Sequence, residues 1–181
     1  MGKYVMLSVM LFSVVASGYV QAEGDAADSS SMPIDLNRRV LNDKAVTVRT
    51  GAVLPLSNVS IYAVYSASSG VEYFGAFDGV TRRQHRGTGE GGVIVVTREI
   101  GQGSAPQAVF NGQNLPPSAN FRTDMICVRH SYYVSPCKSG ETAVGEFRFW
   151  RVDSLNGGVF LYQNTSANTP HRTIRHTIWL H

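Results

Sequence analysis

Apolar and polar residues alternate along most of the chain after residue 45. In residues 59–65 apolar side chains recur at every second position, and residues 93–96 are all β-branched. Because consecutive side chains of a strand point to opposite faces, this alternation predicts β-strands. The predicted strands lie within residues 46–49, 59–65, 71–77, 93–100, 125–134, 146–152, 159–162 and 174–180.

The alternation also assigns side chains to the two faces of a strand. The sets predicted to share a face include Val59, Ile61, Ala63 and Tyr65 in one strand, Phe147 and Phe149 in another, and Ile174, His176, Ile178 and Leu180 near the C-terminus.

Turn-forming residues separate these segments. Gly, Pro, Asn, Asp and Ser cluster at residues 68–70, 78–79, 87–92, 101–103, 111–117, 139–140, 156–158 and 167–170. Many short strands with frequent turns favour an all-β antiparallel sandwich or barrel, with no helix longer than about two turns in residues 45–181. Residues 101–120 form a long polar stretch, interpreted as a surface connection, although loops of this length are often functional.

The first 22 residues have the pattern of a cleavable secretory signal peptide. Lys3 precedes an apolar run at residues 5–15, and Val20 and Ala22 occupy the third and first positions before the predicted cleavage point. The run is too short for a membrane-spanning helix, which needs about 20 apolar residues. Removing residues 1–22 from the 181-residue chain leaves 159 residues, enough for one domain. A buried N-terminal helix is the alternative.

Residues 23–42 are predicted to form a flexible N-terminal arm, followed by a β-sandwich domain at residues 43–181. Residues 23–31 are small, acidic and polar, so they lack the apolar area needed for packing. Further along, Ile34 and Leu36 alternate with polar neighbours, and this part is compatible with either a strand or a short helix.

Cys127 and Cys137 are the only cysteines of the chain. In an oxidising compartment, two cysteines ten positions apart predict a disulfide that closes a local hairpin or loop. The entropy of closing a loop of about 11 residues corresponds to roughly 3 kcal/mol of stabilisation. The alternative is a zinc site, but it needs about four ligands, and Cys127, His130 and Cys137 supply at most three.

The net charge and the motifs of the chain argue against several functional classes. Lys3 is the only charged residue in the first 22, so the mature chain carries a net charge of +2 instead of +3, too little for a general nucleic-acid surface. No nucleophile elbow, zinc-protease motif or Walker motif is present, so we expect no enzyme and no cofactor. His171, His176 and His181 form a conceivable metal site, but solvated histidines are the favoured interpretation, and we expect no metal.

Two segments have residues suited to receptor binding. The first is a basic segment at residues 81–86, and the second is the loop between the cysteines. Arginine pairs well with carboxylates and sulfates, and aromatic faces hold sugars or protein partners. The alternatives are a solvated hairpin tip and an ordinary strand with one tyrosine packed inward. The candidate receptor-binding residues are Arg82, Arg83, Arg86, Arg129, Tyr132 and Tyr133.

The layout of the chain resembles minor subunits of bacterial chaperone–usher fimbriae. The shared features are the signal peptide, the acidic start, one all-β domain and a C-terminal alternating strand. The resemblance implies an immunoglobulin-like, pilin-like sandwich that lacks its last strand. A periplasmic chaperone, and then the N-terminal arm of another fimbrial subunit, would supply that strand by β-augmentation.

This resemblance assigns roles to both ends of the chain. Ile34 and Leu36 would belong to the donor arm, and Ile174, Ile178 and Leu180 to the assembly strand. Two departures, the closely spaced cysteines and the ending Trp179-Leu180-His181 in place of the usual near-terminal Tyr, leave room for a divergent subunit or a tip adhesin.

We therefore expect a fimbrial subunit or adhesin, secreted through the periplasm to a cell-surface fimbria, that attaches to a host or surface receptor such as an acidic glycan or a protein. The alternative is a free secreted glycan-binding module or a toxin-type binding subunit.

Overall fold

The computed structural model describes residues 32–37, 54–74, 84–85, 92–152 and 157–180. The predicted signal peptide at residues 1–22, the acidic start at residues 23–31 and the predicted strand at residues 46–49 lie outside the described residues. Within the described part of the chain, no helix is long and apolar enough to cross a membrane.

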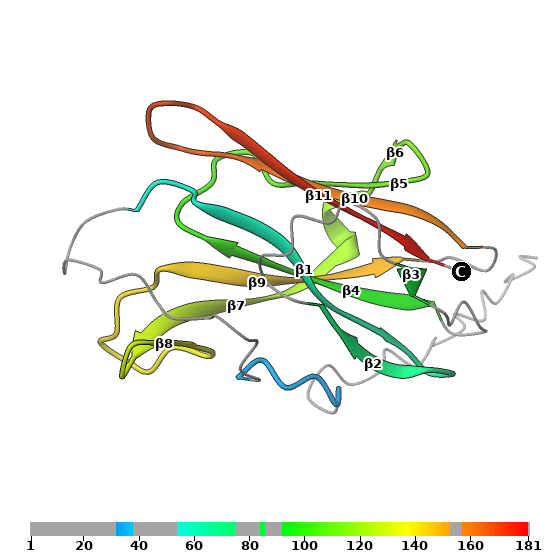
Figure 1. Ribbon diagram of the computed structural model, residues 1–181, viewed down its shortest axis with the longest axis horizontal. Helices are drawn as coiled ribbons and strands as arrows, with labels where there is room; N and C mark the ends of the chain where they lie inside the picture. Colours follow the sequence, from blue (N-terminus) through cyan, green and yellow to red (C-terminus); the bar gives the residue numbers. More distant parts are fainter. Residues whose placement is uncertain (1–31, 38–53, 75–83, 86–91, 153–156, 181) are drawn as a thin grey trace, which may run out of the picture. The chain divides into compact units, whose positions relative to one another are not determined.

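Two β-sheets face each other (Figure 1). The six-stranded sheet contains, in spatial order, β2 (Gly70–Tyr73), β1 (Asn58–Ser66), β4 (Val93–Ile100), β9 (Gly145–Val152), β7 (Asn120–Arg129) and β8 (Tyr132–Val134). The five-stranded sheet contains β3 (Gln84–His85), β11 (Thr173–Leu180), β10 (Gly158–Thr165), β5 (Gln107–Phe110) and β6 (Gln113–Asn114). All strand pairs are antiparallel except β11 with the two-residue β3. The all-β antiparallel sandwich predicted from the sequence is confirmed.

The main hydrophobic core lies between the two sheets. At its centre, the rings of Trp150 on β9 and Tyr162 on β10 lie 5.5 Å apart between centroids. The Trp150 indole N–H donates a hydrogen bond of 3.0 Å to Thr97 Oγ1, so the polar atom of this buried ring is satisfied. The core residues are Leu56, Val59, Ile61, Val64, Phe74, Val93, Val95, Ala108, Trp150, Val152, Phe160, Tyr162, Ile178 and Leu180.

A second hydrophobic cluster covers the outer face of the six-stranded sheet. It consists of Tyr62, Ala63, Val96, Ile100, Ile126, Val144, Phe147 and Phe149. Strand β9 therefore has apolar residues on both faces, because Phe147 and Phe149 alternate with Trp150 and Val152 of the main core. A sheet that is covered on both faces shows this pattern.

Residues 32–37 help to cover this outer cluster. Met32, Ile34 and Leu36 are half-buried against it, while the residues between them are exposed. Figure 1 shows the segment, in blue, beside the six-stranded sheet on the side away from the five-stranded sheet. The part of the predicted arm with alternating apolar residues thus packs on the sandwich of its own chain.

Side chains of the sheet hold the backbone of this segment in place. The Tyr62 hydroxyl donates to the Asp35 carbonyl at 2.9 Å, and the Asp35 N–H donates to the Tyr73 hydroxyl at 2.6 Å. The Asn37 amide exchanges two hydrogen bonds with the backbone of Ser135, of 2.8 and 3.0 Å. Residues 32–37 are therefore docked by polar as well as apolar contacts.

The predicted facing of one strand is wrong in part. A β-bulge between Ile61 and Ala63 adds one residue to β1, so Ile61 faces the main core whereas Tyr62 and Ala63 both join the outer cluster. The Ile61 N–H donates to Nδ1 of His176 on β11, at 2.8 Å. The bulge therefore links the two sheets.

Residues 101–120 are more ordered than a surface connection. They contain β5, β6 and the single 3-10 helix among the described residues, η1 (Pro117–Ala119). Ala108 of β5 belongs to the main core, so the short apolar interruption in this polar stretch is a core strand. The predicted element at residues 125–134 is a hairpin of β7 and β8, not one strand.

Candidate functional site

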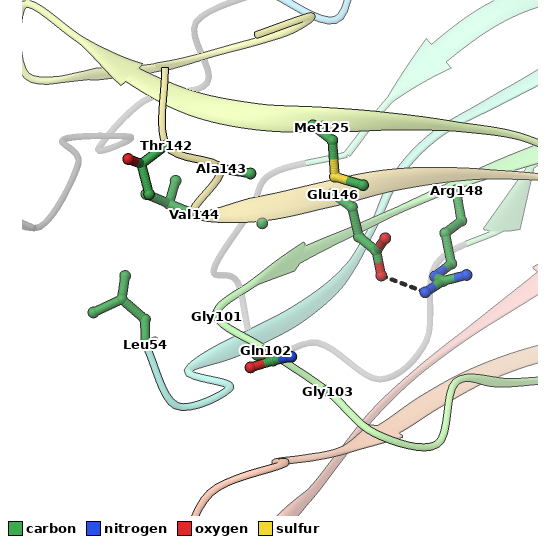
Figure 2. A pocket seen from close by; sticks show the side chains of 11 residues that line it. Leu54, Gly101, Gln102, Gly103, Met125, Thr142, Ala143, Val144, Glu146 and Arg148 are labelled. Carbon is green, nitrogen blue, oxygen red and sulfur yellow. Dashed lines mark hydrogen bonds and ion pairs between the residues drawn. The ribbon is translucent and has the colours of Figure 1, made fainter. Parts of the chain in front are cut away.

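A cleft of about 490 Å³ opens at the side of the sandwich (Figure 2). On the strand β9, Glu146 and Arg148 point to the same side as the core residue Trp150, because they are four and two positions away from it, respectively. Met125 pairs with Glu146 and is 49% exposed. The lining residues are Leu54, Gly101, Gln102, Gly103, Met125, Thr142, Ala143, Val144, Gly145, Glu146 and Arg148.

The charged wall of the cleft is an ion pair between Arg148 and Glu146, which Figure 2 shows as a dashed line. Behind it, Glu99 on β4 is 1% exposed, and its carboxylate lies 3.7 Å from Arg148 Nε. Because Glu99 and Glu146 are directly paired across β4 and β9, one guanidinium serves two neighbouring carboxylates. Such burial of charge is costly unless the groups are paired and hydrogen-bonded.

The five-stranded sheet supplies the partners of Glu99. The Tyr162 hydroxyl donates to one oxygen of the carboxylate, and the Asn164 amide donates to the other at 2.8 Å. Gly103 lies close to this amide, because a Cβ at that position would be 2.0 Å from the Asn164 nitrogen. Gly103 therefore allows the cleft loop to approach the buried network.

Burial and neighbouring charges shift the ionisation of this cluster. Burial raises the pKa of Glu99, and the charge of the nearby Glu146 raises it further. The hydrogen bonds from Tyr162 and Asn164 act in the opposite direction. Burial, together with the charge of Glu99, also raises the pKa of Tyr162. For Arg148, burial acts against the charge, but Glu146 and Glu99 outweigh it, so its pKa is raised and it stays a cation.

The side chain of Arg148 is partly exposed in the cleft. It is 19% exposed and a guanidinium has five N–H donors, while its Nε is buried near Glu99 and makes no hydrogen bond among the described residues. A ligand oxygen in the cleft could accept from Arg148, and a ligand hydroxyl could donate to Glu146. Met125 offers an apolar surface on the same side.

The predicted disulfide is confirmed. Cys127 and Cys137 are bonded, with their Cα atoms 5.4 Å apart. The β7–β8 hairpin beside them turns through His130 and Ser131, whose φ angles of 48° and 64° are those of a type I′ turn. The bridge therefore pins a local hairpin, as the spacing of the cysteines predicted.

The hairpin residues Arg129, Tyr132 and Tyr133 lie around a second hollow, of about 340 Å³. Arg129 forms an ion pair with Glu141, with a hydrogen bond of 2.7 Å from Nη2 to Oε2. That bond is the main cause that lowers the pKa of Glu141 to about 2. The charge of Arg129 is thus engaged within the hairpin, and Tyr133 packs against the outer cluster.

The structure does not bring the two predicted binding segments together. Arg82, Arg83 and Arg86 lie outside the described residues, and of the basic segment only the backbone of β3 is described. Strand β3 forms the edge of the five-stranded sheet next to β11, which packs over β1. The hairpin strand β8 forms the far edge of the other sheet, so the two lie at opposite sides of the sandwich (Figure 1).

The residues predicted for the assembly strand form β11. Ile178 and Leu180 are 1% and 2% exposed in the main core, and Ile174 packs partly against it. Between them the strand turns other side chains outward, and Trp179 is 42% exposed. The predicted alternation of this strand is confirmed.

His171, His176 and the two cysteines have structural partners. His171 Nδ1 lies 3.1 Å from the carbonyl oxygen of Ser166, and His176 accepts from the backbone of β1. Cys127, Cys137 and Glu141 lie close enough to hold an ion, but the cysteines are joined in the disulfide.

The sequence analysis did not find the charged cluster of the cleft. Arg148 lies between Phe147 and Phe149, and Glu99 follows Arg98 at the polar end of its strand, so neither residue stands out from the sequence as part of a buried cluster. The available signal was Asn164, a polar residue at the core position of β10 that follows Phe160 and Tyr162 in steps of two.

Fold and site together define a two-sheet β-sandwich domain with a charged cleft at its side. The chain belongs to the family described as Domain of unknown function (DUF4879), whose model matches residues 51–180. The match includes all described strands and the cleft, and it begins after the docked residues 32–37. The comparisons with curated proteins and with solved structures gave no match.

Proposed function

We propose that this protein is an exported glycan-binding module that folds as a complete sandwich and holds a sugar unit in the cleft beside Glu146 and Arg148. The observation that carries the proposal is the ion pair in the cleft wall, whose two side chains are each 19% exposed. Polar groups converging on a concave site are the usual mark of a small-ligand site.

The chemistry of the cleft suits a neutral polyhydroxylated ligand. A hydroxyl is both a donor and an acceptor, so adjacent hydroxyls of a sugar can accept from Arg148 and donate to Glu146. The exposed part of Met125 can pack against the apolar side of the ring. An anionic ligand would meet two carboxylates, Glu99 and Glu146, with one arginine between them.

The closed core supports a module that is complete on its own. Ile178 and Leu180 of β11 are covered within one chain, whereas a sandwich lacking a strand would expose such residues in a groove. Fimbrial assembly is the second candidate, and it has one supporting observation. Among the described residues, β11 has a strand partner on the β3 side only at Trp179 and Leu180.

Binding to an array of neutral and acidic glycans tests the proposal, with Glu146→Gln compared against Glu141→Gln. Both glutamates pair with an arginine, but only Glu146 lines the cleft. We expect Glu146→Gln to weaken binding of a neutral glycan by about tenfold, the effect of losing one hydrogen bond to a charged group. Equal binding by the two variants would overturn the proposal. Sedimentation of the purified protein at rising concentration tests the assembly candidate, which requires polymers.

A further inference from the structure

The outer face of the five-stranded sheet differs from every other surface described above. Trp179, Val159, Leu161 and Val109 point outward from three neighbouring strands, because their sequence neighbours face the core. Trp179 is one of two large hydrophobic residues that are exposed among the described residues, and the other, Met125, lines the cleft. An exposed indole on a flat sheet is a typical stacking surface for an amphipathic ligand.

A row of amides lies beside this apolar strip. Gln163 donates to Gln107 at 2.6 Å, and Gln107 donates to Asn114 at 2.7 Å, so the row crosses β10, β5 and β6. Each primary amide has two donor hydrogens and two acceptor lone pairs. Groups that use one bond for each other therefore keep capacity for a ligand, at intervals set by a strand spacing of about 4.8 Å.

The charge of this sheet has one sign. None of its five strands contains an aspartate or a glutamate, and Arg175, which pairs with Gln163, is exposed on the outer face. The strands of the other sheet contain charges of both signs, namely Glu72, Glu99, Asp124 and Glu146 together with Arg98, Arg122, Arg129, Arg148 and Arg151. The outer face of the five-stranded sheet is thus complementary to a negatively charged partner.

We propose that this face binds a chain of an acidic polysaccharide. A sugar ring stacks on Trp179, the amide row bonds to hydroxyls along the chain, and Arg175 pairs with a carboxylate or sulfate group. The site is separate from the cleft and does not depend on the function proposed for it.

The same observations do not favour a nucleic acid. Affinity for nucleic acids comes from several basic side chains that each neutralise a phosphate, and this face offers one described arginine. Amides and a single indole instead match a ligand with many hydroxyls and widely spaced charges.

The test uses the full mature chain and measures affinity for dextran sulfate, for uncharged dextran and for polyuridylate RNA. Dextran and its sulfate share one backbone, so their difference isolates the charge. The variants are Trp179→Ala and Arg175→Gln. The control is Arg151→Gln, which removes an exposed arginine from β9. Circular dichroism verifies that each variant is folded.

We expect the wild type to bind dextran sulfate more tightly than dextran or RNA. Trp179→Ala should weaken this binding by about tenfold, the effect of losing one stacking contact. Arg175→Gln should also weaken it and reduce its dependence on salt, because one charge contact is lost, while Arg151→Gln leaves it unchanged. Unchanged affinity of folded Trp179→Ala, equal affinity for RNA, or an equal loss of affinity in Arg151→Gln would each overturn the proposal.

Discussion

On the outer face of the six-stranded sheet, Tyr62, Phe147 and Phe149 are between 1% and 3% exposed, whereas Trp179 on the outer face of the five-stranded sheet is 42% exposed. Both sheets obey the same alternation, and both contribute one face to the main core. The difference lies in what covers the other face. Residues 32–37 pack on the larger sheet, while no described residue packs as a layer over the smaller one.

Apolar side chains on the two outer faces have different roles. The aromatic residues under residues 32–37 form a second core, with the Tyr62 and Phe147 rings 4.8 Å apart between centroids. Trp179 lies outside both clusters. The aromatic residues under residues 32–37 should therefore determine the stability of the fold, whereas Trp179 should determine the binding of a ligand.

The largest effect is expected within one strand that contributes to both faces. Ile178→Asp places a carboxylate in the main core, where Ile178 is 1% exposed, and should cost more than about 4 kcal/mol of unfolding free energy. Thr177→Asp, one position away on the outer face, should cost less than about 1 kcal/mol. Denaturant unfolding measures both. Similar losses for the two variants would mean that β11 does not separate an inner from an outer face.

The disulfide should stabilise the covered side of the larger sheet. Replacing Cys127 and Cys137 together with Ser should lower the unfolding free energy by roughly 3 kcal/mol, because the reduced chain regains the entropy of an open loop. Since Asn37 is bonded to Ser135 inside that loop, hydrogen exchange at residues 32–37 should also become faster. Unchanged exchange at residues 32–37 would show that the hairpin does not hold the docked segment.

A smaller loss is expected from the docked segment itself. The double variant Ile34→Ala/Leu36→Ala removes half-buried side chains from the outer cluster and should cost about 2 kcal/mol. Pro33→Ala, at an exposed position between the contacts, is the control. Denaturant unfolding distinguishes them, and the account fails if the double variant is as stable as the wild type.

The mildest effect concerns the pH dependence of stability. Because burial raises the pKa of Glu99, the folded protein holds this proton more tightly than the unfolded chain. The contribution of Glu99 to the free energy of unfolding is therefore largest at low pH. It declines as the pH rises above the pKa of a glutamate in the unfolded chain, about 4.3. Glu99→Gln should remove this decline, as seen in unfolding curves measured from pH 4 to 8. A decline of the same slope in the variant would exclude Glu99 as its source.

The alternation was enough to predict most of the fold. Residues 59–65, 93–100, 146–152 and 174–180 coincide closely with β1, β4, β9 and β11, since each segment is rich in β-branched or aromatic residues. The bulge in β1 was not predicted, because its extra residue, Tyr62, is itself typical of a strand and does not interrupt the apolar pattern. Strand β5 was missed because its neighbours are turn-forming residues, although Ala108 lies in the core.

The candidate sites were harder to predict, because they depend on contacts between sheets. Glu99, Arg148 and Asn164 come from three strands that are far apart in the sequence, and no local spacing links them. Arg129 was expected to face a receptor, but its pairing with Glu141 required knowledge of the hairpin geometry. The docking of Ile34 and Leu36 depends likewise on an outer face whose aromatic residues are not distinguished in the sequence from those of the main core.

The most direct measurement of the central contrast is hydroxyl-radical footprinting of the native protein, read by mass spectrometry. The account predicts rapid oxidation of Trp179 and slow oxidation of Tyr62, Phe147 and Phe149, with those three becoming reactive when residues 32–37 are deleted. Comparable rates at all four residues in the intact protein, or no change on deletion, would contradict the conclusion that one outer face is covered and the other is open.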